Sequence, residues 1–190
     1  MTEDRARRAE APPRAGWIWI PLLGILSTQL HELGHYLWSV LVDRVEVRMQ
    51  FARVVDLSGR SGTIESMAAG PIDSALLTLI GVAMLWHRSV HVRIVGAGLA
   101  LAMSLSRLTI YAISLDLGMA GNDEGLVSRA VGGGDWTLAL LLLPFFVGGV
   151  VLPVWRSPLR PRWLVVLVSY VAVFFSTLAA FALDRAVFGG

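Results

Sequence analysis

The residues best suited to do chemistry are those of His31-Glu32-Leu33-Gly34-His35, an H-E-x-x-H motif inside a long apolar stretch. On a helix, positions four apart project from one face, so both imidazoles can bind one Zn²⁺. Glu32, one step round the helix, can hold a water and take its proton. Zinc lowers the pKa of that water toward ~7 and prepares it to attack a polarised carbonyl. The motif predicts zinc-dependent peptide hydrolysis, with His31 and His35 as metal ligands and Glu32 as general base.

The apolar surroundings of the motif favour a metal site over a chance match. Within a membrane span, a charged and unpaired side chain costs roughly 2.5 kcal/mol or more, and here three ionisable residues share one span. The same helical face carries Gly24, Ser27 and Thr28, which indicates a face turned toward protein rather than lipid. The chain has no cysteine, so only His, Asp or Glu can complete the site.

A third protein ligand is expected, because two histidines and a water leave one zinc position unfilled. The candidates are acidic residues of the second span and of the loop after the third span, namely Asp73, Asp116, Asp123 and Glu124. We favour Asp123, because Gly118 and Gly121 let the chain turn back toward the metal. Asp116 is the alternative ligand, although it lies at the end of the third span, and that helix restricts where its side chain can extend. Asp123 has a competing role as the N-cap of a short helix over 124–131.

Composition requires a lipid environment for the elements that carry these residues. Of the 190 residues, 55% are hydrophobic and 16% are charged, whereas soluble chains are about 45–50% apolar and about 25% charged. The apolar residues form blocks of about 20 residues, the length that a bilayer core requires. The fold class predicted is an all-α membrane protein of about five transmembrane helices, with spans over 16–42, 67–86, 92–115, 137–155 and 163–183.

The segment 45–65, between the first two spans, has a different pattern. Val45, Val47, Met49 and Phe51 alternate with polar residues, which predicts a β-hairpin at the membrane surface. The run 58–62, Ser-Gly-Arg-Ser-Gly, is typical of a turn. Residues 1–15 are expected to form a flexible tail and residues 184–190 a short C-terminal tail, so that 16–183 make one membrane-embedded domain.

Depth along the helices predicts which polar residues meet. With a rise of 1.5 Å per residue, the two histidines lie roughly 10–17 Å from the end of their span, Asp73 about 9 Å into the second span, and Arg107 about 12 Å from the end of the third. These groups share a layer, so we expect an ion pair between Asp73 and Arg107, or a substrate contact by Arg107. His87 and His91 fall at the opposite membrane face and are expected to be surface residues.

The basic residues, all of them arginine, are explained better by topology than by nucleic-acid binding. An N-terminus inside the cell places the arginines of two connections inside as well: Arg88, Arg93, Arg156, Arg160 and Arg162. The four arginines over 44–60 favour the reverse. We expect an integral protein of a bacterial cell membrane with a cytoplasmic N-terminus and no nucleic-acid partner.

The motifs together resemble the site-2-protease-like intramembrane metalloproteases, the M50 peptidases, over about two-thirds of the chain. His31 to His35 reads HELGH, the form that the family favours. Residues 68–74, AAGPIDS, look like the family's A-A-G-P-(L)-(A)-N, with Ser74 where Asn is usual and Asp73 where a small residue is usual. Residues 122–129, NDEGLVSR, look like the family's L-D-G element with one residue inserted, and 115–118, LDLG, is a rival match.

The resemblance implies a compact zinc metalloendopeptidase without PDZ or CBS modules, acting on membrane-protein substrates. It also implies that Asp123 is the third ligand, with Asp73, Ser74 and Arg107 as possible substrate-contacting or structural residues. Three alternatives remain open: a non-proteolytic relative with a structural metal, a metal transporter, and an inactive subunit that anchors partners. A transporter would place ionisable groups at several depths, whereas this chain groups them in one layer. An intact Glu32 argues against the inactive subunit.

Overall fold

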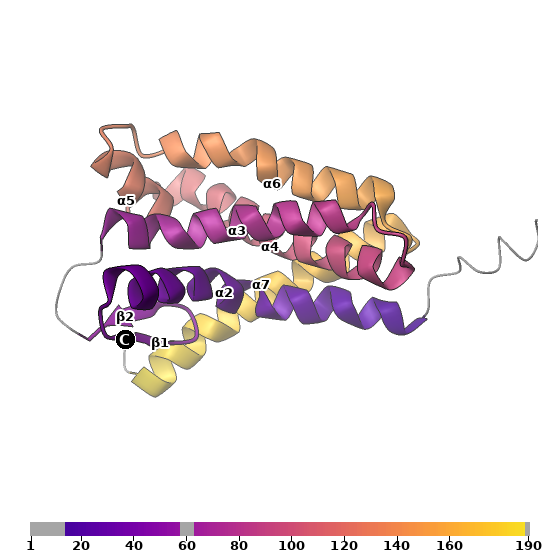
Figure 1. The fold of residues 1–190 in the computed structure, drawn as a ribbon, viewed down its shortest axis with the longest axis horizontal. Coiled ribbons are helices and arrows are strands. Elements are labelled where there is room, and N and C mark those ends of the chain that lie inside the picture. Colours follow the sequence, from indigo (N-terminus) through magenta and orange to yellow (C-terminus); the bar gives the residue numbers. More distant parts are fainter. Residues whose placement is uncertain (1–13, 58–62, 189–190) are drawn as a thin grey trace, which may run out of the picture.

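The structure, a computed structural model, describes residues 14–57 and 63–188. Apart from one two-stranded hairpin, its regular elements are helices (Figure 1). In chain order the elements are η1 (Arg14–Ile18), α2 (Trp19–Trp38), η2 (Ser39–Asp43), β1 (Val47–Met49), β2 (Val54–Asp56), α3 (Ile64–Met84), α4 (Val90–Leu117), α5 (Asp123–Ala130), α6 (Thr137–Arg156) and α7 (Arg162–Phe188).

Four of the described helices, α3, α4, α6 and α7, are long and apolar enough to cross a membrane. They present large apolar side chains outward, such as Leu140, Phe175 and Leu178, which a lipid environment would cover. α2, with 20 residues, is as long as α6 and packs alongside α3, α4 and α7. The predicted fold class is confirmed: this is a helical multi-pass membrane protein with a small antiparallel hairpin after its first long helix.

Successive helices run in alternating directions, which separates the connections between two ends of the molecule. The hairpin, α5 and the end of α7 lie at one end, and the connections α3–α4 and α6–α7 lie at the other (Figure 1). At this second end, Nη2 of Arg93 donates a hydrogen bond to the carbonyl oxygen of Arg156 at 3.3 Å. His87 and His91 are exposed there, away from α5, as alternation of the spans predicts.

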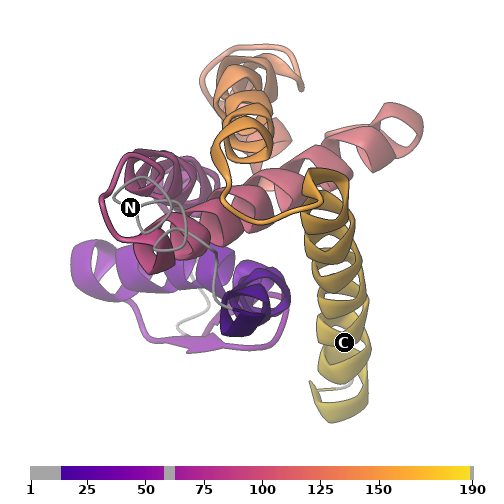
Figure 2. The ribbon, with the colours of Figure 1, turned by 90° about the vertical axis from the view of Figure 1, so that its right-hand side faces the viewer.

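α4 forms the centre of the helical assembly. It packs against α2, α3, α6 and α7. Of the apolar stretch by which each helix could span a membrane, 67% is buried in α4, against 22% in α6 and in α7. Figure 2 shows α4 between α6 and α2, with α7 leaning along one side. A close approach of α3 and α4 depends on Gly81, because a Cβ there would lie 2.6 Å from the backbone nitrogen of Ala100.

The hairpin is shorter than the sequence pattern indicates. Val47 pairs with Asp56 and Met49 with Val54, so the chain reverses over 50–53, and the predicted turn over 58–62 lies outside the described residues. The predicted boundary at residue 65 is wrong, because α3 begins at Ile64. The side chain of Thr63 caps that helix by accepting a hydrogen bond from the backbone N–H of Ser66 at 3.1 Å.

The predicted C-terminal tail is wrong over its first five residues, because α7 continues to Phe188. Asp184 ends the apolar run in the sequence, yet it is only 5% exposed. Its carboxylate accepts hydrogen bonds from the backbone N–H groups of Phe51 and Ala52, at 2.7 and 3.0 Å. Two charge-assisted hydrogen bonds compensate for the burial of this carboxylate, and they fasten the hairpin turn to the end of α7.

Candidate metal centre

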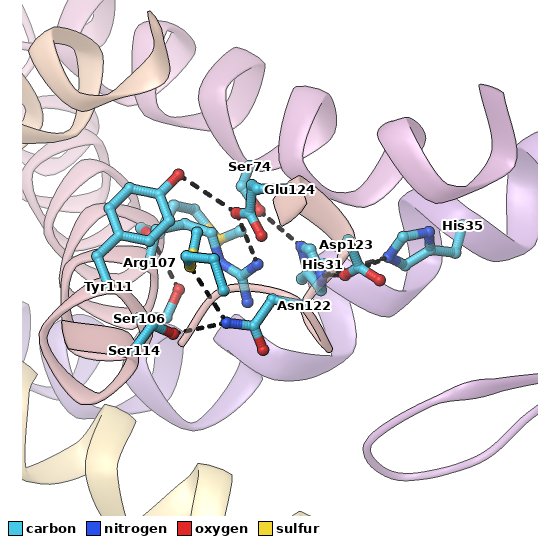
Figure 3. A network of polar contacts seen from close by, with 12 residues as sticks. His31, His35, Ser74, Ser106, Arg107, Tyr111, Ser114, Asn122, Asp123 and Glu124 are labelled. Atoms are coloured by element: carbon cyan, nitrogen blue, oxygen red, sulfur yellow. Dashed lines mark hydrogen bonds and ion pairs between the residues drawn. The ribbon is translucent and has the colours of Figure 1, made fainter. Parts of the chain in front are cut away.

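Three potential ligand atoms converge where the H-E-x-x-H motif of α2 meets the start of α5. Nε2 of His31, Nε2 of His35 and Oδ2 of Asp123 lie 3.3 Å from one another in all three pairs. Figure 3 shows the three side chains pointing toward a common point. Among the described residues, this is the group of His, Asp and Glu side chains that could hold a metal ion.

The separations fit a small tetrahedral cation. Zinc bonds of ~2.0–2.1 Å to nitrogen and oxygen place neighbouring ligand atoms of a tetrahedron ~3.3–3.4 Å apart, which matches the observed triangle. The two imidazole rings meet edge to face at 89°, so their lone pairs converge without the rings stacking. Three such ligands would leave one position of a tetrahedron open to water.

The other ring nitrogens are held by groups that select the ligating tautomer. Nδ1 of His35 donates to the backbone carbonyl of Ser66 at 2.6 Å. Because a carbonyl only accepts, the neutral form of this imidazole has its lone pair on Nε2. Nδ1 of His31 lies 3.0 Å from the hydroxyl of Ser74, which accepts when Nε2 of His31 is the ligand. Such hydrogen bonds orient metal-binding histidines. The sequence suggested either a substrate-contacting or a structural role for Ser74, and in the structure Ser74 contacts His31.

The start of α5 places Asp123. Asn122 is the N-cap residue, but its side chain makes no capping hydrogen bond. Its amide instead donates to the hydroxyl of Ser114 at 2.6 Å, which ties the loop to α4. Gly118, at φ +83°, ends α4 and lets the chain turn. The predicted short helix over 124–131 is present one residue earlier, as α5, with Asp123 as its first residue.

The charge of Asp123 suits a metal ligand. Burial by itself would raise the pKa of this carboxyl, but the hydrogen bonds with His31 and His35 outweigh burial and hold the pKa below its usual range. The side chain is therefore an anion aimed at two imidazole nitrogens. Asp116, the alternative ligand, is exposed near the end of α4 and is not part of the group.

The predicted ion pair between Asp73 and Arg107 is wrong. Nη1 of Arg107 instead pairs with Oε1 of Glu124 at 3.2 Å, and the hydroxyl of Tyr111 donates to the same oxygen at 3.2 Å. Asp73 faces α2: a Cβ added to Gly34 of that helix would lie 2.7 Å from the Cβ of Asp73. Depth along a helix was predicted correctly, but rotation about the axis directs Arg107 toward α5 and Asp73 toward α2.

Gly70 brings α3 close to the imidazoles. A Cβ on this residue would collide with Nε2 of His35 and lie 2.6 Å from Cε1 of His31. The A-A-G-P segment of α3 therefore forms one wall of the site. Only a residue without a side chain permits this approach of backbone to ligand atoms.

A cavity of about 600 Å³ opens onto the candidate ligands. Glu32, 8% exposed, lines it together with His31, His35 and Asp123. The other walls come from the hairpin, from α4 and from α7, which contributes Phe181. Polar groups and apolar side chains thus line one space next to the acidic side chain that the motif assigns as general base.

Sequence reasoning missed one group at the site and misassigned two acidic residues near it. The carbonyl of Ser66 carries no side-chain signal. Glu124 was considered as a ligand, but it is fully buried and paired with Arg107. Asp184 was placed in a tail, although a carboxylate directly after an apolar span is a signal that could have identified it.

No family model, no curated protein and no solved structure matches this chain.

Proposed function

We propose that this chain is an intramembrane zinc metallopeptidase that hydrolyses peptide bonds of membrane-protein substrates, with His31, His35 and Asp123 as the metal ligands. The observation that carries the proposal is the triangle of ligand atoms with 3.3 Å sides, built on an H-E-x-x-H motif. The resemblance of the HELGH and A-A-G-P segments to the M50 peptidases supports the same assignment.

The remaining groups have roles that suit hydrolysis. A zinc ion, when bound, polarises a carbonyl oxygen and makes water more acidic. Glu32 lines the cavity beside both histidines, from where it takes a proton from the attacking water and passes it to the leaving amine. Ser74 and the carbonyl of Ser66 hold the imidazoles in place.

The open side of the triangle favours this function over a structural metal site. A structural zinc ion is enclosed by four protein ligands, whereas the group found among the described residues has three. We further propose that the protein lies in a bacterial cell membrane with its N-terminus in the cytoplasm, because the arginines of the α3–α4 and α6–α7 connections share the end of the molecule where η1 and α2 begin.

The test separates metal binding from proton transfer. The full chain is reconstituted in proteoliposomes with single-span test proteins, and cleavage is measured by gel while bound zinc is measured by mass spectrometry. Glu32→Gln, which cannot accept the proton, is expected to retain zinc and to lose cleavage by at least a hundredfold. His35→Ala is expected to lose both.

Asp116→Asn serves as the matched control for Asp123→Asn. We expect Asp123→Asn to weaken zinc retention and cleavage together, while Asp116→Asn changes neither. Full cleavage by Glu32→Gln would refute the peptidase. Zinc bound by an intact chain that cleaves none of the test proteins would favour a structural metal, and zinc movement into the vesicles would favour a transporter.

A further inference from the structure

A second cavity, of about 490 Å³, lies at the end of the molecule opposite the candidate metal centre. It is formed between the α3–α4 and α6–α7 connections. Among the residues that the structure describes, four arginines and no acidic residue line it: Arg88, Arg93, Arg156 and Arg160. Four cations around one cavity repel one another, so the arrangement favours an anion between them.

Two of the arginines are held in place by groups that leave their charge uncompensated. The guanidinium of Arg156 stacks over the ring of Trp86 at 4.4 Å, which fixes its position and adds no negative charge. Nη2 of Arg93 donates to the carbonyl of Arg156, while its Nε is buried and has no acceptor among the described residues. A neutral carbonyl and an aromatic ring leave both guanidinium charges without a counter-ion among the described residues.

The position of this cavity identifies the kind of anion. Trp155 lines it at the end of α6 and is 65% exposed, and Trp86, which follows the end of α3 and stacks against Arg156, is 54% exposed. Exposed tryptophans at the ends of spanning helices mark the boundary between hydrocarbon and headgroups. At that depth the abundant anions are lipid phosphates, and basic pockets between transmembrane segments bind anionic headgroups.

We propose that this arginine cavity binds the phosphate headgroup of an anionic phospholipid, which joins the α3–α4 connection to the α6–α7 connection. Arg93 and Arg156 contact the phosphate, and Arg88 and Arg160 add to the positive field at the mouth of the cavity. The site is independent of the candidate metal centre.

The experiment uses the purified full chain in an uncharged detergent. Binding of short-chain phosphatidylglycerol is titrated by native mass spectrometry, in parallel with phosphatidylcholine, which has a phosphate but no net charge, and with inorganic phosphate. We expect phosphatidylglycerol to bind at least tenfold more tightly than either, because the arginines attract a ligand that carries a net negative charge and lies at the membrane surface.

Substitutions locate the binding. Arg93→Gln and Arg88→Gln are each expected to weaken phosphatidylglycerol binding roughly fivefold, as expected for one cation near an anionic surface. Arg88 makes no hydrogen bond or ion pair with the described residues, so its substitution removes charge without removing a contact. Arg185→Gln, an exposed arginine at the opposite end of α7, is the matched control.

Each outcome decides the proposal. A selective loss in the two cavity variants, with Arg185→Gln unchanged, supports it. Equal binding of the two lipids, or equal loss in all three variants, overturns it and indicates nonspecific attraction. Binding of inorganic phosphate as tight as that of phosphatidylglycerol overturns the lipid assignment in favour of a soluble anion.

Discussion

The buried pair of Arg107 and Glu124 is expected to control both stability and the placement of Asp123. Glu124 is fully buried, and its Oε1 accepts hydrogen bonds from Arg107 and Tyr111. Arg107→Met removes the cation and leaves a buried carboxylate with one hydroxyl donor. Removing one partner of a buried ion pair costs about 3–5 kcal/mol. At about 2–4 °C per kcal/mol for a chain of this size, Tm should fall by roughly 6–20 °C.

A double-mutant cycle isolates the pair from other effects of the substitution. Arg107→Met with Glu124→Gln removes both charges, so the double variant should recover most of the Tm lost by Arg107→Met. Thermal unfolding of the purified chain in detergent, followed by tryptophan fluorescence, measures this. Because Glu124 adjoins Asp123 at the start of α5, zinc retention should fall with the single substitution and recover with the double.

Asp73→Asn is the matched control, since Asp73 shares the depth of Arg107 but faces α2. We expect it to change Tm by less than about a quarter of the Arg107→Met effect. The reasoning is refuted if the double variant is no more stable than Arg107→Met alone, or if Asp73→Asn destabilises the chain as strongly as Arg107→Met does.

Three further substitutions test the surroundings of the candidate metal centre. Gly70→Ala should abolish zinc binding in a metal-content assay, because its Cβ would collide with an imidazole, whereas Gly148→Ala, where a Cβ meets nothing within 4 Å, should bind zinc normally. Ser74→Ala should weaken zinc affinity about 10–100-fold, as for other groups that orient a ligating histidine. Ser169→Ala is its control and should leave zinc affinity unchanged, because Ser169 is a buried serine whose hydroxyl has no partner among the described residues. Asp184→Ala should speed hydrogen exchange at the hairpin turn at least tenfold, because two charge-assisted bonds worth about 1.5–3 kcal/mol each are lost; unchanged exchange would contradict the proposed anchor.

Local spacing predicted the parts of this protein that depend on a few neighbouring residues. The long helices follow from the apolar blocks and the hairpin from the alternation after Val45. The convergence of His31 and His35 follows from their separation by four positions on α2, because helical geometry alone places such residues on one face. Alternation of the helices also placed His87 and His91 at the far end.

Tertiary structure decided the features that require two distant segments to meet at a defined angle. The sequence favoured Asp123 over Asp116, because glycines let the chain turn before it. The tertiary structure adds the hydrogen bond from Asn122 to Ser114 of α4, which, with the turn at Gly118, aims Asp123 at the histidines. The depth of Arg107 along α4 was predicted correctly, but the rotation of α4 about its axis makes Glu124 its partner. The position of a residue along the axis of its helix follows from the number of residues to the helix end. The direction in which its side chain points depends on the rotation of the helix about that axis, which the packing of all neighbouring helices sets together.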